Sequence, residues 1–267
     1  MRGFLAVFLF LLATGAATAG DSRLQRLDTG DDGRAWEAVG RLDLAGRGFC
    51  TATLIAPDVV LTAAHCLFDK VDGSRLETSK IEFLAGWRNG RASAYRRIRR
   101  AVLHPDYDFS ADVSSDRVRN DIALLKLYHP IRNTRVIPFQ TDRQPRKGDR
   151  IGVVSYALDR AEAPSLQEVC DVMARQQGML VMSCEVDFGS SGAPIFSFDS
   201  GQARVVSVVS AMAELDGRKV SLGTELQDSL DLLRSRLTPG GRGLAEEAPR
   251  IPEQGTRQIS GAKFAKP

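Results

Sequence analysis

Three short segments hold side chains that together could carry out nucleophilic chemistry. His65 follows an apolar run, Asp121 opens another, and Ser191 lies in a glycine-rich stretch. A serine hydroxyl is a poor nucleophile near neutral pH unless a base takes its proton, and histidine suits that task because its ordinary pKa is about 6.5. A carboxylate on the second ring nitrogen would fix the tautomer and stabilise the imidazolium. These residues are therefore predicted as base, orienting carboxylate and nucleophile.

The glycines around Ser191 indicate the same chemistry. Gly189 and Gly192 bracket Ser190 and Ser191, and glycine permits a tight turn in which backbone N–H groups converge. Such donors can hold the negative oxygen of a tetrahedral intermediate. Taken singly, a histidine after a strand, an aspartate that opens a strand and a glycine-rich loop are usually structural. Together, in this order and with a cysteine beside the histidine, they favour catalysis.

The elements that must position these residues are short. Apolar runs recur along the chain with Gly, Pro and Asp between them, and few stretches show helical periodicity. Many short strands of this kind predict an all-β sandwich or barrel. The strands expected from these runs are 48–55, 59–63, 81–87, 121–127, 150–158, 178–185 and 204–212.

Composition also marks the segments that connect and flank the predicted strands. The proline-containing, polar stretch 128–149 is predicted to connect two β units, and the polar segment 20–34 is predicted to be flexible. A capping box at Thr224 predicts the start of a late helix, and residues 238–267 are predicted as a disordered tail because they have almost no apolar periodicity. The leucines with helical spacing are Leu226, Leu230, Leu233 and Leu237.

The first residues resemble an export signal. A basic end at Arg2 precedes the apolar run 4–12 and the small-x-small sequence Ala17-Thr18-Ala19, so residues 1–19 are predicted to be a signal peptide. The apolar run is too short to span a bilayer, and no later segment approaches about 18 to 20 continuous apolar residues. We therefore expect a secreted or periplasmic protein without stable membrane insertion.

The four cysteines allow three disulfide pairings, and the sequence alone does not choose among them. In an oxidising compartment the local pairs Cys50–Cys66 and Cys170–Cys184 are the natural expectation. A zinc site is the alternative, but no C-x-x-C is present and the three histidines are scattered, so no metal is expected. No cofactor motif is found either.

The charge balance argues against a nucleic-acid partner, because 36 Lys and Arg stand against 33 Asp and Glu. The one basic cluster has six arginines between Arg88 and Arg100. It could bind an anionic glycan, an acidic protein or a membrane surface. More often such a run is a solvated face, and the alternation in 97–99 is typical of an exposed strand.

At this point a resemblance to the trypsin/chymotrypsin family of serine proteases is plain. Ala63-Ala64-His65-Cys66 resembles its histidine motif, Asp121 to Leu125 its aspartate motif, and Gly189 to Pro194 its nucleophile loop. The order of the three motifs is also that of the family. The resemblance implies two antiparallel six-stranded β-barrels, about 35–130 and 146–237, with a C-terminal helix and the active site between the barrels.

The resemblance also implies roles for single residues. His65 would be base and then acid, Asp121 would orient it, and Ser191 would attack the scissile carbonyl. The backbone N–H groups of Gly189 and Ser191 would form the oxyanion hole. The strand around Ser210 would pair with an extended substrate. A Cys50–Cys66 bridge would hold the histidine loop.

The nucleophile loop departs from the trypsin pattern at Ser190, where trypsin-like enzymes carry an aspartate that pairs with a newly freed N-terminal amine. Ser190 has no charge, so we expect maturation without that salt bridge, as in the bacterial glutamyl endopeptidases that this loop resembles. Glu185 stands six residues before Ser191, where trypsin has its pocket aspartate, and Asp187 lies close by. The two carboxylates indicate either a pocket for Arg or Lys or a solvated loop.

The sequence thus predicts a monomeric serine endopeptidase that acts on protein or peptide substrates. A catalytically inactive homologue that serves as a binding module is the alternative, because a fold does not guarantee activity. An esterase on an α/β scaffold is disfavoured, since its motifs run Ser, acid, His and its strands alternate with helices.

Overall fold

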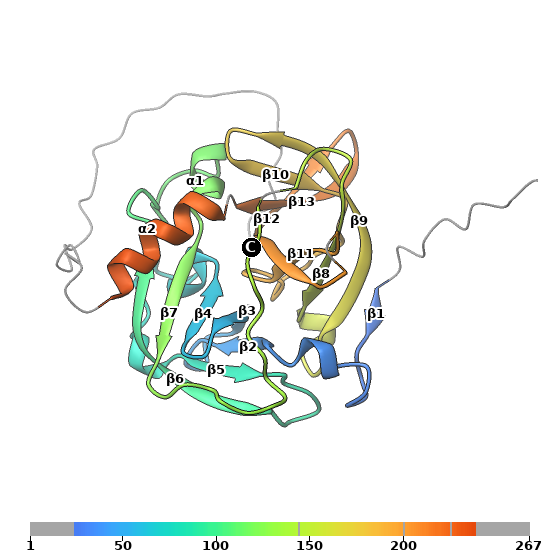
Figure 1. Ribbon diagram of the computed structural model, residues 1–267. Coiled ribbons are helices and arrows are strands. Elements are labelled where there is room, and N and C mark those ends of the chain that lie inside the picture. Colours follow the sequence, from blue (N-terminus) through green and yellow to red (C-terminus); the bar gives the residue numbers. More distant parts are fainter. Residues whose placement is uncertain (1–23, 144, 200, 225, 239–267) are drawn as a thin grey trace, which may run out of the picture.

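Six strands between Val39 and Leu127 form a first closed barrel. In the computed structural model, which describes residues 24–143, 145–199, 201–224 and 226–238, every strand of this barrel is antiparallel to its neighbours. The barrel order is β2 (Val39–Asp43), β3 (Phe49–Ala56), β4 (Val59–Thr62), β7 (Ala123–Leu127), β6 (Ala94–Leu103) and β5 (Glu82–Ala85) (Figure 1).

A second antiparallel barrel follows the connection after β7. Its order is β8 (Arg150–Ser155), β9 (Ser165–Gln176), β10 (Met179–Met182), β13 (Arg218–Thr224), β12 (Arg204–Leu215) and β11 (Pro194–Ser197). Pairing of β8 with both β9 and β11 closes the ring. The all-β architecture of two six-stranded barrels predicted from the sequence is confirmed, as is a C-terminal helix, α2 (Gln227–Leu237).

Each barrel has its own apolar core, and a third core joins them. Phe83 and Leu125 lie inside the first barrel, and Val153 and Met182 lie inside the second. Between the barrels, Trp36 packs edge-on against Phe196 of β11 with ring centroids 5.0 Å apart. Because this shared core contains residues of both barrels, it fixes how the two walls of a site between them face each other.

Helix α2 lies beside β6 and β7 of the first barrel (Figure 1). Its predicted apolar stripe is buried, and the four leucines are 0% to 8% exposed. The predicted capping box is wrong, because Thr224 ends β13 and its hydroxyl is used elsewhere. The helix begins at Gln227 with Leu226 as its N-cap residue and has no side-chain cap.

Part of segment 20–34, which the sequence predicts to be flexible, contacts the second barrel. Gln25–Arg26 form a short strand, β1, antiparallel to β9, and Leu27 is 1% exposed in the core between the barrels. A strand of two residues is too short to show strand periodicity, so the sequence alone could not reveal that this segment is attached to the second barrel. The predicted signal peptide and the tail beyond Thr238 lie outside the described residues. No helix in the described ranges is long and apolar enough to cross a membrane.

Candidate active site

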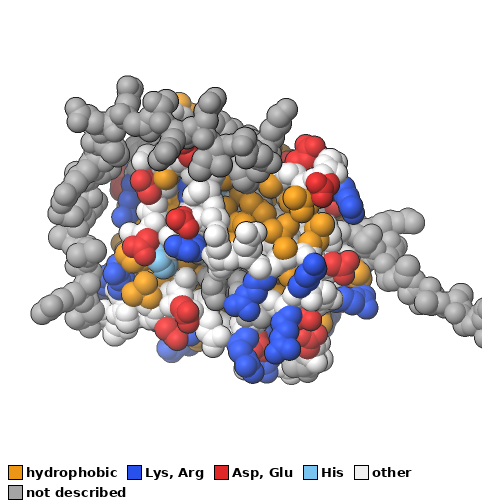
Figure 2. Space-filling model, turned by 90° about the horizontal axis from the view of Figure 1, so that it is seen from above, with side chains coloured by type: hydrophobic (Ala, Val, Ile, Leu, Met, Phe, Trp, Pro, Cys, Tyr) orange, Lys and Arg blue, Asp and Glu red, His pale blue; other side chains and the backbone are white. Residues whose placement is uncertain are grey.

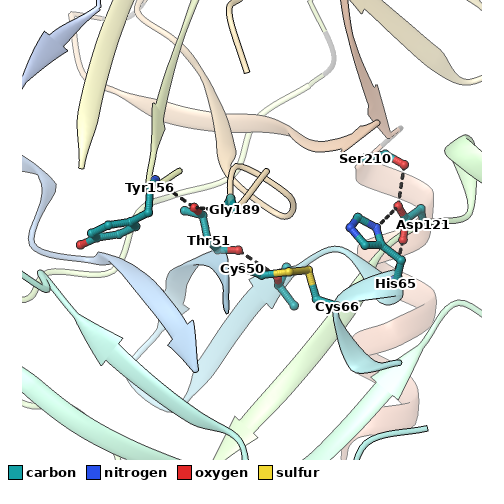
Figure 3. The surroundings of a disulfide bond; sticks show 9 residues. Cys50, Thr51, His65, Cys66, Asp121, Tyr156, Gly189 and Ser210 are labelled. Atoms are coloured by element: carbon teal, nitrogen blue, oxygen red, sulfur yellow. Dashed lines mark hydrogen bonds and ion pairs between the residues drawn. A yellow bond between two sulfur atoms is a disulfide. The ribbon is translucent and has the colours of Figure 1, made fainter. Parts of the chain in front are cut away.

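His65 lies on a 3-10 turn, Ala64–Leu67, that follows β4 directly. The turn is held on both sides, because Ala64, Cys66 and Leu67 are buried and Cys66 is bonded to Cys50 of β3. The second predicted disulfide, Cys170–Cys184, is also present. Because its neighbours are buried and cross-linked, the main chain of His65 is held in place, as Figure 3 shows for the disulfide beside it. The His65 side chain is only 13% exposed.

Asp121 holds the histidine by two bonds. Its Oδ2 lies 2.6 Å from Nδ1 of His65, and its Oδ1 accepts a hydrogen bond of 2.8 Å from the backbone N–H of His65. The hydroxyl of Ser210 donates to the same Oδ2 at 2.5 Å. A carboxylate at Nδ1 favours the tautomer with its proton on that nitrogen, which leaves Nε2 able to accept one. Figure 3 shows Asp121 lying between His65 and Ser210.

The main chain that carries Asp121 is fixed by the second barrel. The turn after α1 (Ser115–Arg119) is closed by a bond from the N–H of Asp121 to the carbonyl of Val118. The buried hydroxyl of Thr224, at the end of β13, contacts the carbonyl oxygens of Val118 at 2.8 Å and Asp121 at 3.3 Å. This contact explains why Thr224 is not available as a helix cap.

The nucleophile loop needs its glycines. Gly189 and Gly192 have φ of +99° and +74°, a region that residues with a Cβ rarely adopt. A Cβ on Gly192 would also lie within 2.8 Å of the backbone nitrogen of Ala63, beside the histidine turn. The loop is anchored to the first barrel, since the carbonyl of Ser191 accepts a bond of 2.9 Å from the N–H of Thr51. The nucleophile loop can therefore approach the His65 turn this closely only because Gly192 has no side chain.

The two backbone N–H groups expected to form an oxyanion hole differ from those of the neighbouring residues. Among the described residues, neither Gly189 nor Ser191 donates a backbone hydrogen bond, whereas the N–H groups of Ser190, Gly192 and Ala193 all do. The Gly189–Ser190 peptide, which lies between the two expected donors, is held from outside, because the carbonyl of Gly189 accepts a bond of 2.9 Å from the hydroxyl of Thr51. Unpaired N–H groups on such a loop are suited to receive a developing negative charge.

His65, Asp121 and Ser191 line one pocket of about 380 Å³ between the barrels. Its size suits a substrate side chain or short segment. Within the described chain no hydrogen bond joins the His65 ring to the Ser191 hydroxyl. Catalytic hydrogen bonds are often long before substrate binds and tighten in the complex. The arrangement thus brings together all three predicted residues around one opening.

The two residues predicted to bind substrate behave differently. Glu185 is exposed and lies outside the pocket lining, so its position six residues before the nucleophile does not bring its side chain there. Asp187 does line the pocket, but so do Lys70, Asp112 and Arg117, so the charge of the lining does not by itself favour a basic substrate. Ser210 lines the pocket while its hydroxyl is committed to Asp121.

An apolar surface adjoins the pocket on the outside of the second barrel. Partly exposed side chains from β9, β10 and β12 pack there against Val118, Val220 and Leu222, and Figure 2 shows apolar side chains gathered on this face. The partly exposed members are Val113, Met173, Met179, Val181, Ala211 and Ala213. Val113, Val118 and Ala211 belong to both the surface and the pocket, so the two are continuous.

Some residues of the site were missed by sequence reasoning. Thr51 and Thr224 have buried hydroxyls whose partners lie more than 100 positions away in the sequence, and no local pattern marks these contacts. Tyr107 lines the pocket, and burial together with the nearby Asp121 raises its pKa well above the ordinary value. Its place in His104-Pro105-Asp106-Tyr107, a motif resembling a family loop, was the one available signal.

Comparisons with known proteins agree with this geometry. Human kallikrein-15 is 33% identical over 158 residues, which cover 58% of this chain and 56% of kallikrein-15. Glutamyl endopeptidase of Bacillus licheniformis is 23% identical over 171 residues, which cover 64% of this chain and 52% of that protein. The chain thus spans about half the length of these two relatives.

A solved structure of a Glu endopeptidase in complex with MPD shares the fold, with a TM-score of 0.66 and 18% identity over 82% of this chain and 97% of that one. The family model described as Trypsin matches residues 30–224, which is well over half of the chain and includes all three motif segments. The chain therefore belongs to the trypsin family.

Proposed function

We propose that this protein is an exported serine endopeptidase that hydrolyses peptide bonds through a covalent acyl-enzyme. The observation that carries the proposal is the pocket between the barrels, which is lined by Ser191, His65 and Asp121 together. Membership of the trypsin family supports the same activity. Endopeptidase action fits a pocket that is open to solvent and continuous with an apolar surface.

In this mechanism each polar group has a task. Nε2 of His65 takes the proton of Ser191 as its Oγ attacks the scissile carbonyl, and Asp121 stabilises the imidazolium through the bond at Nδ1. The N–H groups of Gly189 and Ser191 receive the carbonyl oxygen as it becomes negative. His65 then gives its proton to the leaving amine, and water releases the acyl group by the reverse sequence.

The substrate is proposed to add a strand to β12. β12 pairs with β11 only as far as Val208, and from Ala211 to Leu215 it has β13 on one side. No strand of the described chain covers its other side over Ala211–Leu215, and that edge leads into the pocket. Main-chain pairing of this kind gives affinity without dictating sequence. A peptide that follows β12 would pass the apolar surface, so aliphatic side chains are expected upstream of the cleaved bond.

Export is proposed on two grounds. The first 19 residues have the composition of a signal peptide, and two disulfides join all four cysteines. Disulfides form and persist in oxidising compartments. A secreted or periplasmic location fits both observations.

Peptide hydrolysis by the purified mature protein tests the proposed activity. Protein beginning at Gly20 is assayed with a peptide library, beside Ser191→Ala and a matched control, Ser197→Ala, on β11 of the same barrel. We expect the Ser191 change to lower kcat by at least about 10⁴-fold, and the Ser197 change to leave it unaltered. A correctly folded wild type that binds peptides and cleaves none would instead support the inactive binding module.

A further inference from the structure

Ser190, the neighbour of the proposed nucleophile, lies in a buried polar network. Its side chain is 0% exposed and does not line the pocket. The hydroxyl donates to the carbonyl of Tyr156 at 3.1 Å, lies 3.2 Å from Oγ of Ser155, and accepts a bond of 3.3 Å from the N–H of Asp187. Ser190 belongs to the nucleophile loop and Tyr156 follows β8, so this hydroxyl joins the loop to the chain after β8.

An arginine reaches the same hydroxyls. Arg160 ends a 3-10 turn, Leu158–Arg160, and its Nη2 lies 3.2 Å from Oγ of Ser155 and 3.5 Å from Oγ of Ser190. Its Nη1 forms an ion pair of 3.1 Å with Asp159, which is itself 70% exposed. The arginine side chain is 11% exposed. Burial of a cation is costly unless it is hydrogen-bonded, so its donors stabilise this arrangement of the two serines.

The polarity of this network is the reverse of the trypsin pattern. There, a loop aspartate before the nucleophile binds an N-terminal amine, whereas here the loop supplies a neutral hydroxyl and the cation comes from within the folded chain. We propose that Arg160 is a positioning residue that holds the nucleophile loop in its active conformation through Ser190 and Ser155. The inference rests on the proposed endopeptidase function. It predicts an oxyanion hole that forms on folding, without a freed N-terminus.

Two substitutions at Arg160 and one matched control separate positioning from general stability. Arg160→Met removes the charge and donors but keeps the stem, and Arg160→Lys restores one charge. Arg88→Met is the control, because Arg88 is 12% exposed and its Nε donates to the carbonyl of Leu27, outside the pocket lining. We expect Arg160→Met to lower kcat by about tenfold to a hundredfold with little change in KM. The Arg88→Met control should keep wild-type kcat even if it loses as much thermal stability as Arg160→Met.

The lysine variant adds a pH signature that a merely structural role would not produce. A guanidinium keeps its charge throughout the accessible range, whereas a lysine ordinarily titrates near about 10.4, and lower when buried. Arg160→Lys should recover part of the kcat at pH 8 and gain an alkaline fall that the wild type lacks. Wild-type kcat in both folded Arg160 variants would overturn the inference.

A double-mutant cycle tests the contact itself, and the Arg160→Lys variant covers the case in which Arg160→Met folds poorly. Ser190→Asp places a carboxylate opposite the guanidinium and should stay within about tenfold of wild-type kcat/KM. In the Arg160→Lys background we expect a weaker ion pair with the new carboxylate. In the Arg160→Met background the buried carboxylate has no cationic partner. We expect the Ser190→Asp/Arg160→Met variant to fall at least about tenfold below the product of the single effects. Additive effects would contradict the contact.

These outcomes are distinct from failure of the proposed function. If the wild type cleaves no peptide and reacts with no serine-directed probe, the endopeptidase proposal fails and Arg160 has no loop to position. If the wild type is active and the Arg160 variants match it, only the inference fails.

Discussion

Replacement of Thr51 by valine is expected to damage both stability and catalysis. Thr51 is 0% exposed on β3, and its hydroxyl donates to the carbonyl of Gly189 at 2.9 Å while accepting a bond of 3.0 Å from the N–H of Tyr156. Valine has nearly the same shape but no polar atom. The substitution therefore leaves one carbonyl and one N–H without this partner where β3 of the first barrel meets the second barrel (Figure 3).

The size of the effect follows from these two groups. An unsatisfied buried donor or acceptor costs about 1 to 3 kcal/mol, so with two such groups the free energy of unfolding should fall by about 2 to 6 kcal/mol. The Gly189–Ser190 peptide would lose the bond that holds its carbonyl, so the N–H groups of Gly189 and Ser191 on either side of it would be less firmly placed. We expect kcat to fall about tenfold or more, up to the roughly 10² to 10³-fold loss that follows removal of an oxyanion donor.

Urea unfolding and peptide hydrolysis, measured on the same preparations, test this reasoning. Thr51→Ser keeps the hydroxyl and should cost about 1 kcal/mol, with kcat near wild type. Thr53→Val is a second control, because Thr53 is also buried on β3 but donates to the carbonyl of Ala38. It should lower stability without lowering kcat. A Thr51→Val protein as stable and active as Thr51→Ser would refute the argument.

Three further predictions concern the histidine and aspartate segments. Burial lowers the pKa of His104, so the unfolded chain binds more protons below about pH 6.5, and stability should fall as pH drops from there towards the folded pKa. In urea unfolding between pH 7 and 5, His104→Gln should flatten this fall by up to about 1.4 kcal/mol per pH unit, and an unchanged slope would argue against a buried neutral imidazole. Removal of the Cys50–Cys66 bridge by a double change to alanine should cost about 3 kcal/mol of unfolding free energy, and a loss under 1 kcal/mol would contradict its role in holding the histidine turn. Ser210→Ala removes one of the bonds to Asp121 and should lower kcat about tenfold with KM unchanged, whereas a rise in KM alone would assign Ser210 to substrate binding.

The motif segments and the barrels could be predicted because their signals are local. Residues such as His65 and Ser191 lie in short stretches whose types and order are distinctive, and β-branched runs such as that in β4 report strands directly. β13 was missed, because its first two residues are exposed and charged and its apolar part is short. β2, β9 and β11 were also absent from the expected strands.

Contacts that join distant parts of the chain could not be predicted. The hydroxyl of Thr51 meets Gly189 across 138 positions, and that of Thr224 meets Val118 across 106. A threonine that serves such a contact looks like any β-propensity residue in the sequence. For Thr224 the local capping pattern even predicted a different partner. Glu185 shows the same limit, because a matched offset from the nucleophile does not fix the path of the intervening loop.

Site-mapped labelling by a fluorophosphonate probe tests the central claim most directly, because the probe reacts with a serine only when a base and an oxyanion hole activate it. Digestion and mass spectrometry of the labelled mature protein should place one adduct per chain on Ser191. The His65→Ala protein, with folding verified by circular dichroism, should give no adduct. An unlabelled wild type, an adduct on another serine, or full labelling without the imidazole would contradict the account.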